Sequence, residues 1–201
     1  LPYSRDTRWN YLGLVNEPCF RKGTGPDPNR YGLWLNVRDP ACGPDPFANA
    51  DKYKGVQVGA RGKTVAVASY YGEPAGVVGL RLFPNPAFDE EARRKWDSER
   101  YYRDASYYES RNLVKPYRVG MSCGFCHVGP NPVKPPADPE NPRWENLSSN
   151  VGAQFFWWDR VFDWRGTTNQ SSFSYQALHT SLPGTLDTSL VSTDNINNPR
   201  T

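Results

Sequence analysis

Long apolar runs are missing from this sequence. Its 201 residues have a mean hydropathy of −0.75, and no stretch approaches the length that crosses a bilayer. We therefore expect no membrane span.

An excess of charge of one sign is also missing. The chain has 24 Lys and Arg against 21 Asp and Glu, a net charge of +3, and the basic residues 93–95 directly follow the acidic residues 89–91. Such a balanced distribution does not predict nucleic-acid binding, and we expect the 89–95 cluster to be a solvated helix face.

Residues that could ligate a metal are scarce, with one methionine, two histidines and four cysteines. Three of them stand together as Cys123-Gly124-Phe125-Cys126-His127, and Cys-x-x-Cys-His is the spacing at which c-type haem is attached. Two thiols on a short helical turn can each form a thioether to one haem vinyl group, and His127 is then held beneath the iron. The motif predicts one covalent haem c with His127 as its proximal ligand.

A Cys-x-x-Cys pair can also be a redox site or half of a zinc site. A redox Cys-x-x-Cys pair would follow a strand and begin a long helix, whereas a proline-rich run follows here. A zinc site would need a second pair of ligands, and no such pair remains in the chain. Both readings are weaker than haem.

The remaining cysteines, Cys19 and Cys42, lie in a segment dense in Gly and Pro. We predict that they form a disulfide, which stabilises the fold by about 3 kcal/mol in the chain-entropy model. The alternative is two buried thiols. Disulfide and covalent haem both indicate a periplasmic or secreted protein, whose secretory signal would have been removed before Leu1 or lies outside this sequence.

The second axial ligand decides what such a haem does. Met121 is tethered two residues before Cys123, so a distal methionine is disfavoured and His179 becomes the best candidate. His179 could instead be an ordinary helix-end histidine. The distal face would then be open, filled by Trp158 or Tyr175, or ligated from another chain or segment.

Several residues are candidates to contact the haem. Its propionates need cationic or hydrogen-bonding partners, and simple surface exposure is the alternative for the charged ones. The candidates that flank the motif are Arg118, Lys134, Arg143 and Trp144. Trp158 is a further candidate from a downstream aromatic segment, although packing in the core is the simpler role for any one aromatic residue there.

The predicted fold class is mainly α with much irregular coil. The irregular coil is expected because 36 of the 201 residues are Pro or Gly. We expect a loop-rich N-terminal region at 1–110, containing the disulfide and a small β-hairpin, and a cytochrome c-like haem-binding region at 111–201. The hairpin pairs 62–70 with 76–83, and a further short strand covers 31–37.

Helices are predicted from apolar spacing and capping residues. Asp89 caps one helix, Asn150 caps another with an aromatic face, and residues 130–142, with six prolines, form a stiff loop around the haem edge. The last twenty residues read as loop. The expected helices are 90–96, pieces within 98–108, 120–128, 151–162 and 172–180.

Two stretches, SCGFCHVGPNPVKPPADPENPRWENLSSNVGAQFF and PGTLDTSLVSTDNINNPR, resemble large bacterial c-type cytochromes related to the dihaem rubber oxygenases and, more distantly, the dihaem cytochrome c peroxidase superfamily. The resemblance covers mainly residues 119–200. It implies a periplasmic or secreted protein with two covalent haems, one open for oxygen or peroxide chemistry. Cys123, Cys126 and His127 would match the first haem site, but the chain has one such motif. A second haem would then belong to a longer protein or to a partner subunit.

The leading functional prediction is an extracytoplasmic electron-transfer cytochrome with one haem and a redox partner protein or second haem-bearing chain. Two alternatives remain open. One is a haem-dependent oxygenase or peroxidase with an open distal face near Trp157, Trp158 or Tyr175. The other is a haem-carrying subunit of a larger multihaem complex.

Overall fold

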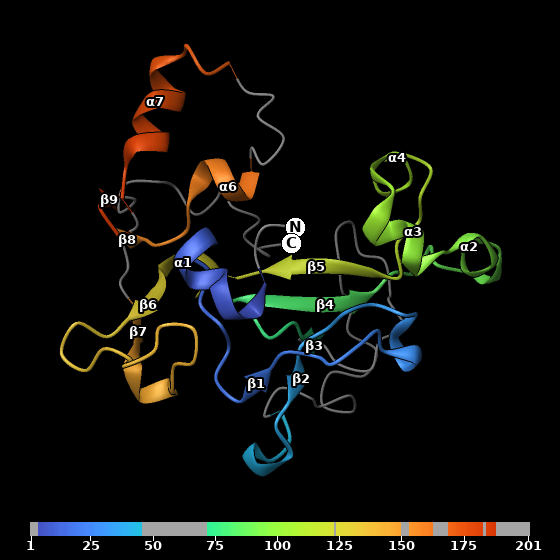
Figure 1. Cartoon of the computed structure of the whole chain (residues 1–201), viewed down its shortest axis with the longest axis horizontal. Coiled ribbons are helices and arrows are strands. Elements are labelled where there is room, and N and C mark those ends of the chain that lie inside the picture. The colour runs from blue at the N-terminus through green and yellow to red at the C-terminus, as the bar shows by residue number, and fades with distance from the viewer. Residues whose placement is uncertain are drawn as a thin grey trace. The chain divides into compact units, whose positions relative to one another are not determined.

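The computed structural model describes residues 4–45, 72–122, 124–149, 153–162, 169–182 and 184–187 (Figure 1). The α-helices of these residues are α1 (Arg8–Leu12), α2 (Glu90–Lys95), α3 (Ser98–Arg103), α4 (Ala105–Tyr108), α5 (Gly124–His127), α6 (Trp158–Phe162) and α7 (Phe173–Thr180). The strands are β1 (Phe20–Arg21), β2 (Val37–Arg38), β3 (Glu73–Pro74), β4 (Leu80–Pro84), β5 (Tyr117–Met121), β6 (Val128–Pro130), β7 (Leu147–Ser149), β8 (Ala153–Gln154) and β9 (Leu186–Asp187). Short 3₁₀ turns cover Arg5–Thr7, Pro28–Arg30, Pro40–Cys42 and Trp144–Asn146.

The predicted fold class, a mainly α fold with a cytochrome c-like core, is wrong. The longest described helix, α7, has eight residues, and several small antiparallel sheets lie between the helices. Prolines and glycines with positive φ recur along the chain, and both interrupt helices, so no long helix forms among the described residues. The chain divides into two compact units that interleave along the sequence.

The first unit contains the described residues of 1–21, 76–79 and 121–199. The end of α1 and the segment after it make backbone hydrogen bonds to two other parts of the chain. Leu12 O accepts from Trp157 N at 2.8 Å, and Val15 O accepts from Val78 N at 2.9 Å. β6 pairs with β7 from Val128↔Ser149 to Pro130↔Leu147, and β8 pairs with β9. The buried apolar side chains include Leu12, Leu14, Val15, Val78, Phe125 and Phe156.

The second unit contains the described residues of 22–75 and 80–120. Its sheet has the order β3-β4-β5, and Figure 1 shows β4 and β5 as its two long arrows. The chain then forms three short helices whose N-termini are capped by aspartates: Asp89, Asp97 and Asp104 each accept backbone N–H groups. Trp96 and Tyr31 pack around the buried Phe88 ring.

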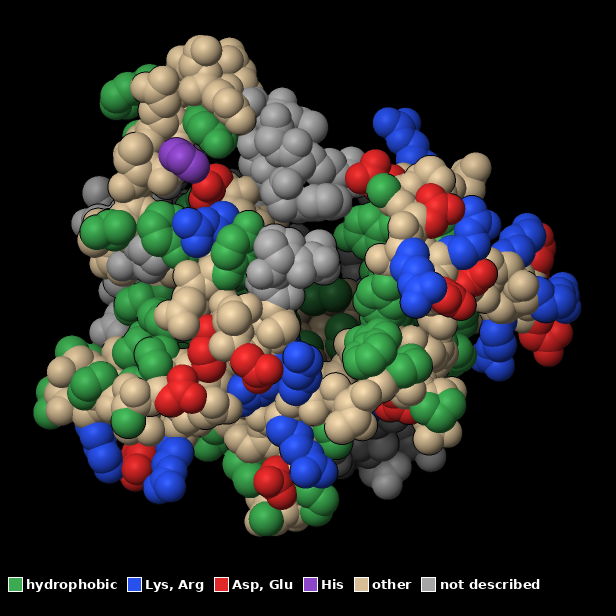
Figure 2. Space-filling model, in the orientation of Figure 1, with side chains coloured by type: hydrophobic (Ala, Val, Ile, Leu, Met, Phe, Trp, Pro, Cys, Tyr) green, Lys and Arg blue, Asp and Glu red, His purple; other side chains and the backbone are tan. Residues whose placement is uncertain are grey.

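Charges on these three helices are balanced, as Figure 2 shows by the mixed blue and red side chains over this part of the molecule. Ion pairs one helical turn apart join Glu91 to Lys95, Glu99 to Arg103 and Arg100 to Asp104. The predicted helices at 90–96 and within 98–108 are confirmed, and so is the solvated charged face.

The predicted hairpin and short strand are only partly found. Its first strand, 62–70, lies outside the described residues, while the second is shortened to β4. β4 pairs with β3, Glu73↔Leu82, inside the expected loop. At 31–37 the strand prediction is wrong, because Tyr31 and Gly32 form a left-handed turn and β2 begins only at Val37.

The predicted helix at 151–162 is also wrong over its first half. Ala153 and Gln154 form β8, and only α6 is helical; residues 150–152 lie outside the described part. The aromatic spacing resembled a helix, but pairing of Gln154 with Leu186 on β9 favours an extended backbone. The predicted helix at 172–180 is confirmed as α7, capped by the Ser172 hydroxyl.

The predicted disulfide is confirmed. Cys19 and Cys42 are disulfide-bonded. Among the described residues, no helix is long and apolar enough to cross a membrane.

Candidate haem site

The motif residues form a single helical turn. Gly124 to His127 are α5, and Phe125 N donates to Ser122 O at 3.0 Å to close the turn before it. Ser122 N in turn donates to Gly79 O at 2.9 Å. The predicted helix at 120–128 is confirmed for these four residues and wrong at its ends, because 120–121 belong to β5 and 128 belongs to β6. Cys123 lies outside the described part of the chain.

Phe125 anchors this turn. Its side chain is 7% exposed, and its ring centre lies 5.2 Å from that of the buried Phe156. Gly79, at a φ of +79°, lies so close beneath the turn that a Cβ there would collide with Phe125 N. The spacer residue of the motif therefore holds the turn in the core, while Cys126 is a half-buried thiol and His127 is also half-buried.

Phe155 packs against the strand that follows the motif. Its backbone N donates to Cys126 O at 3.3 Å, and a Cβ on Gly129 would lie 2.5 Å from its ring. The Trp9 ring centre is 6.2 Å away from the Phe155 ring centre. Glycine at position 129 thus makes room for an aromatic ring beside the motif.

The proline-rich loop after the motif is held by a buried polar network. Glu140, 4% exposed, accepts from Trp9 N at 2.9 Å, Asn10 N at 3.0 Å and Asn16 Nδ2 at 3.0 Å. Arg5, 7% exposed, donates to Glu140 O at 2.9 Å. The end of the loop is therefore fixed to the start of α1, which agrees with the predicted stiffness; contact with a haem edge stays a prediction.

Asp138 orders the same end of the loop. The Asn141 side-chain amide and Glu140 N donate to its carboxylate. These two hydrogen bonds hold the pKa of Asp138 below its ordinary value, because they stabilise the ionised form. The loop end thus forms a turn that charge-assisted hydrogen bonds to Asp138 stabilise.

The propionate candidates are exposed or have partners within the protein. Lys134 pairs with Glu145 at 3.1 Å, Arg143 is exposed, and Trp144 is 58% exposed. Arg118 belongs to the second unit, where its Nε donates to Asn85 Oδ1 at 3.0 Å. Their contact with a haem stays a prediction.

Trp158 is linked to the motif through the core. Its ring centre lies 5.6 Å from that of Phe156, which also packs on Phe125. Its indole Nε1 donates to Gln154 Oε1 at 2.5 Å. Trp158 thus belongs to the aromatic cluster behind α5, and 38% of it is exposed.

His179 lies in the last turn of α7 and pairs with Asp159 in the first turn of α6. The distance from His179 Nδ1 to Asp159 Oδ2 is 2.7 Å, and the Tyr175 ring stacks on the imidazole at 5.4 Å with 12° between the planes. The His179 side chain is 52% exposed. It is therefore a helix-end histidine with a carboxylate partner, and ligation of iron by His179 stays a prediction.

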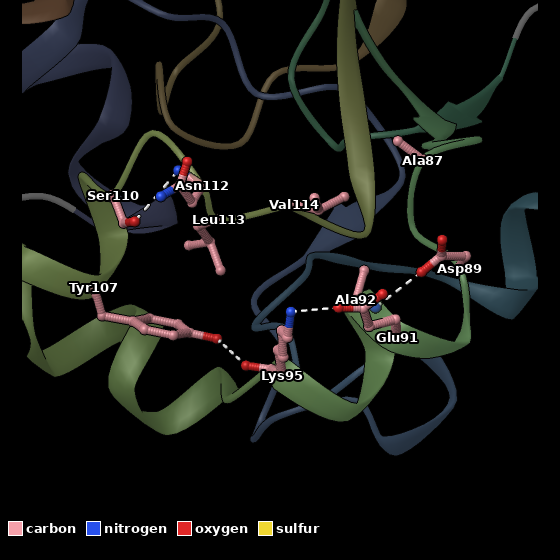
Figure 3. A pocket seen from close by; sticks show the side chains of 10 residues that line it. All are labelled: Ala87, Asp89, Glu91, Ala92, Lys95, Tyr107, Ser110, Asn112, Leu113 and Val114. Atoms are coloured by element: carbon pink, nitrogen blue, oxygen red, sulfur yellow. Dashed lines mark hydrogen bonds and ion pairs between the residues drawn. The ribbon is translucent and has the colours of Figure 1, made fainter.

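The second unit has a pocket of about 360 Å³ between α2, α4 and the loop that follows α4 (Figure 3). Ala92, Leu113 and Val114 give it an apolar side. At its rim, Lys95 pairs with Glu91, and the Tyr107 hydroxyl donates to Lys95 O. Of the charged residues that line it, Lys95 pairs with Glu91, and Asp89 accepts from Ala92 N as the cap of α2, so each of them already has a partner within the protein.

The donor set of the motif fits a covalent haem. Cys126 and His127 are consecutive residues of α5, both half-buried, and both follow a residue that fixes the turn in the core. Among the described residues there is no group of three or more metal-ligating side chains. Sequence reasoning missed three residues that support the motif region through contacts distant in sequence, and it missed Asp159, the partner of His179. The three are Gly79, Phe155 and Glu140, and only Gly79, which lies between apolar residues, carries a local signal.

Comparison of the chain with protein-family models, with curated proteins and with solved structures finds no match.

Proposed function

We propose that this chain is an extracytoplasmic c-type cytochrome that carries one haem on Cys123 and Cys126 and transfers electrons to or from a redox partner. His127 is the proximal ligand. The observation that carries the proposal is the motif turn: Cys-x-x-Cys-His ends on a single helical turn that Phe125 fixes in the core.

The disulfide supports the location. Disulfides persist in oxidising compartments, and thioether attachment of haem also takes place outside the cytoplasm. The same compartment therefore suits both features of the chain.

Electron transfer is favoured over catalysis by the available ligands. A haem that carries electrons usually has two strong protein ligands, and His179 is the one other histidine in the sequence. The haem would supply the redox chemistry, while this chain positions it and excludes water through the cluster of Phe125, Phe156 and Trp158.

The resemblance to the dihaem oxygenase and peroxidase superfamily remains part of the proposal. It implies that a second haem lies on another segment or on a partner chain, because the sequence has one Cys-x-x-Cys-His motif. In such an arrangement this haem is one of several redox centres through which electrons pass.

Absorption spectra of the oxidised and reduced holoprotein, with and without carbon monoxide, test the function. Electron transfer predicts a low-spin spectrum and a Soret band that carbon monoxide leaves nearly unchanged. A high-spin spectrum that shifts on addition of carbon monoxide would instead support oxygen or peroxide chemistry. A potentiometric titration of the same sample should show one reversible one-electron step.

A further inference from the structure

The pair formed by His179 and Asp159 is the arrangement that prepares a histidine for metal ligation. Asp159 and His179 come from the two neighbouring helices α6 and α7, and their side chains meet at 2.7 Å. An ionised carboxylate only accepts hydrogen bonds, so the imidazole donates through Nδ1, and in the neutral imidazole Nε2 then keeps its lone pair. The pair therefore fixes the tautomer that binds a metal through Nε2.

The orientation of the imidazole is fixed as well. Tyr175 lies one helical turn before His179, and its ring stacks on the imidazole almost in parallel. Rotation of the imidazole would break both the stack and the hydrogen bond to Asp159. His179 is thus held in one position although half of its side chain is exposed.

Asp159 differs from an ordinary surface partner. Its side chain is 15% exposed, and its second oxygen, Oδ1, is buried without a hydrogen-bond partner within the described part of the chain. An ordinary surface ion pair leaves both carboxylate oxygens in water. A shielded carboxylate whose hydrogen bonding is directed to one imidazole N–H is typical of the residue behind a metal-ligating histidine.

Other strong axial ligands in the chain are restricted. Cys19 and Cys42 are bonded to each other, and Met121 ends β5 two residues before the motif. We propose that Asp159 is a positioning residue that holds His179 as the second axial ligand of the haem, bound through Nε2. This inference rests on the proposed function, since it requires the haem on Cys123 and Cys126.

The test uses the holoprotein with His179→Gly, which removes the imidazole and leaves space at the iron. The low-spin spectrum should become high-spin, and added imidazole should restore it. Imidazole has an N–H to donate to Asp159 and 1-methylimidazole does not, so imidazole should bind about tenfold more tightly. An unchanged low-spin spectrum, or equal affinities, would overturn the inference.

Two double variants measure the contribution of the Asp159 carboxylate to imidazole binding. In His179→Gly with Asp159→Asn, the preference for imidazole over 1-methylimidazole should disappear, because the neutral amide is a poorer acceptor. The matched control is His179→Gly with Asp6→Asn, which removes an equal charge at an exposed position and should keep the preference. A preference of the same size in both double variants would contradict a role for Asp159.

The pyridine haemochrome assay separates this inference from the proposed function. Covalent haem in all variants, together with a His179→Gly protein that stays low-spin, refutes the ligand and leaves the cytochrome. Absence of covalent haem from the unaltered protein refutes both.

Discussion

At the scale of single residues, the buried carboxylate of Glu140 joins distant segments of the first unit. Its carboxylate accepts three hydrogen bonds from the start of α1 and from Asn16, and Asn16 is fully buried. Glu140→Ala removes the acceptor of Trp9 N and Asn10 N, whereas Asn16 Nδ2 still donates to Arg5 O and Glu140 O. The change should lower the free energy of unfolding by about 3 kcal/mol. Glu145→Ala, at an exposed ion pair, should change it by less than about 0.5 kcal/mol in the same urea titration. Equal effects would show that the network does not stabilise the fold.

Asp104 gives a pH-dependent prediction. Hydrogen bonds from the Ser106 hydroxyl, the Arg100 guanidinium and Tyr107 N hold the pKa of this carboxyl far below its ordinary value. Since the folded pKa is below the unfolded value of about 3.9, the stabilisation is present above that pH and is lost as pH falls through the folded pKa. Asp104→Asn should therefore lower Tm at pH 7, by less at high salt because the site is exposed. The Tm difference from the unaltered protein, followed by circular dichroism, should shrink towards pH 2; a constant difference would contradict this cause.

At the scale of elements, the motif turn depends on a glycine beneath it. Gly79 and Gly43 both have a φ near +70 to +80°, but only Gly79 lies against another backbone segment, at Phe125. Gly43→Ala should cost about 1–3 kcal/mol from backbone strain alone, because a φ of 70° with a ψ of −177° is a conformation that only glycine adopts readily. Gly79→Ala should cost at least about 3 kcal/mol, as overpacking adds to that penalty, and should reduce haem incorporation. Urea denaturation and the haem-to-protein absorbance ratio of both variants check this, and equal effects would show that the close approach is not needed.

Elements with local causes could be predicted from the sequence. The helix α2 has its cap, Asp89, and its complementary charges within seven residues, and α7 has its Ser172 cap. The helix at 151–162 failed because the extended state of Gln154 depends on β9, more than thirty residues away.

The candidate site divides in the same way. Cys126 and His127 could be predicted as haem-binding residues from their spacing alone. Asp159, in contrast, has no local sequence pattern that joins it to His179, twenty residues later. The Glu140 network likewise links positions more than a hundred residues apart. Tertiary pairing of this kind leaves no periodic signal in one sequence.

At the scale of the whole molecule, the disulfide should contribute to stability independently of the haem motif. Cys19 and Cys42 close a loop of about twenty residues, which corresponds to about 3 kcal/mol in the chain-entropy model. The double variant Cys19→Ala/Cys42→Ala should lower the free energy of unfolding by that amount and still bind haem. Equilibrium urea unfolding and the haem content measure the two effects, and a variant as stable as the unaltered chain would contradict the first.

The central claim is that haem is attached covalently at Cys123 and Cys126. The most direct measurement is intact mass spectrometry with a pyridine haemochrome assay on the protein matured outside the cytoplasm, beside Cys123→Ser/Cys126→Ser and Cys19→Ser/Cys42→Ser. We predict a mass increase of one haem in the unaltered chain and in the Cys19→Ser/Cys42→Ser variant, and none in the motif variant. An unaltered chain without covalent haem, or haem that stays on the motif variant, would contradict the account.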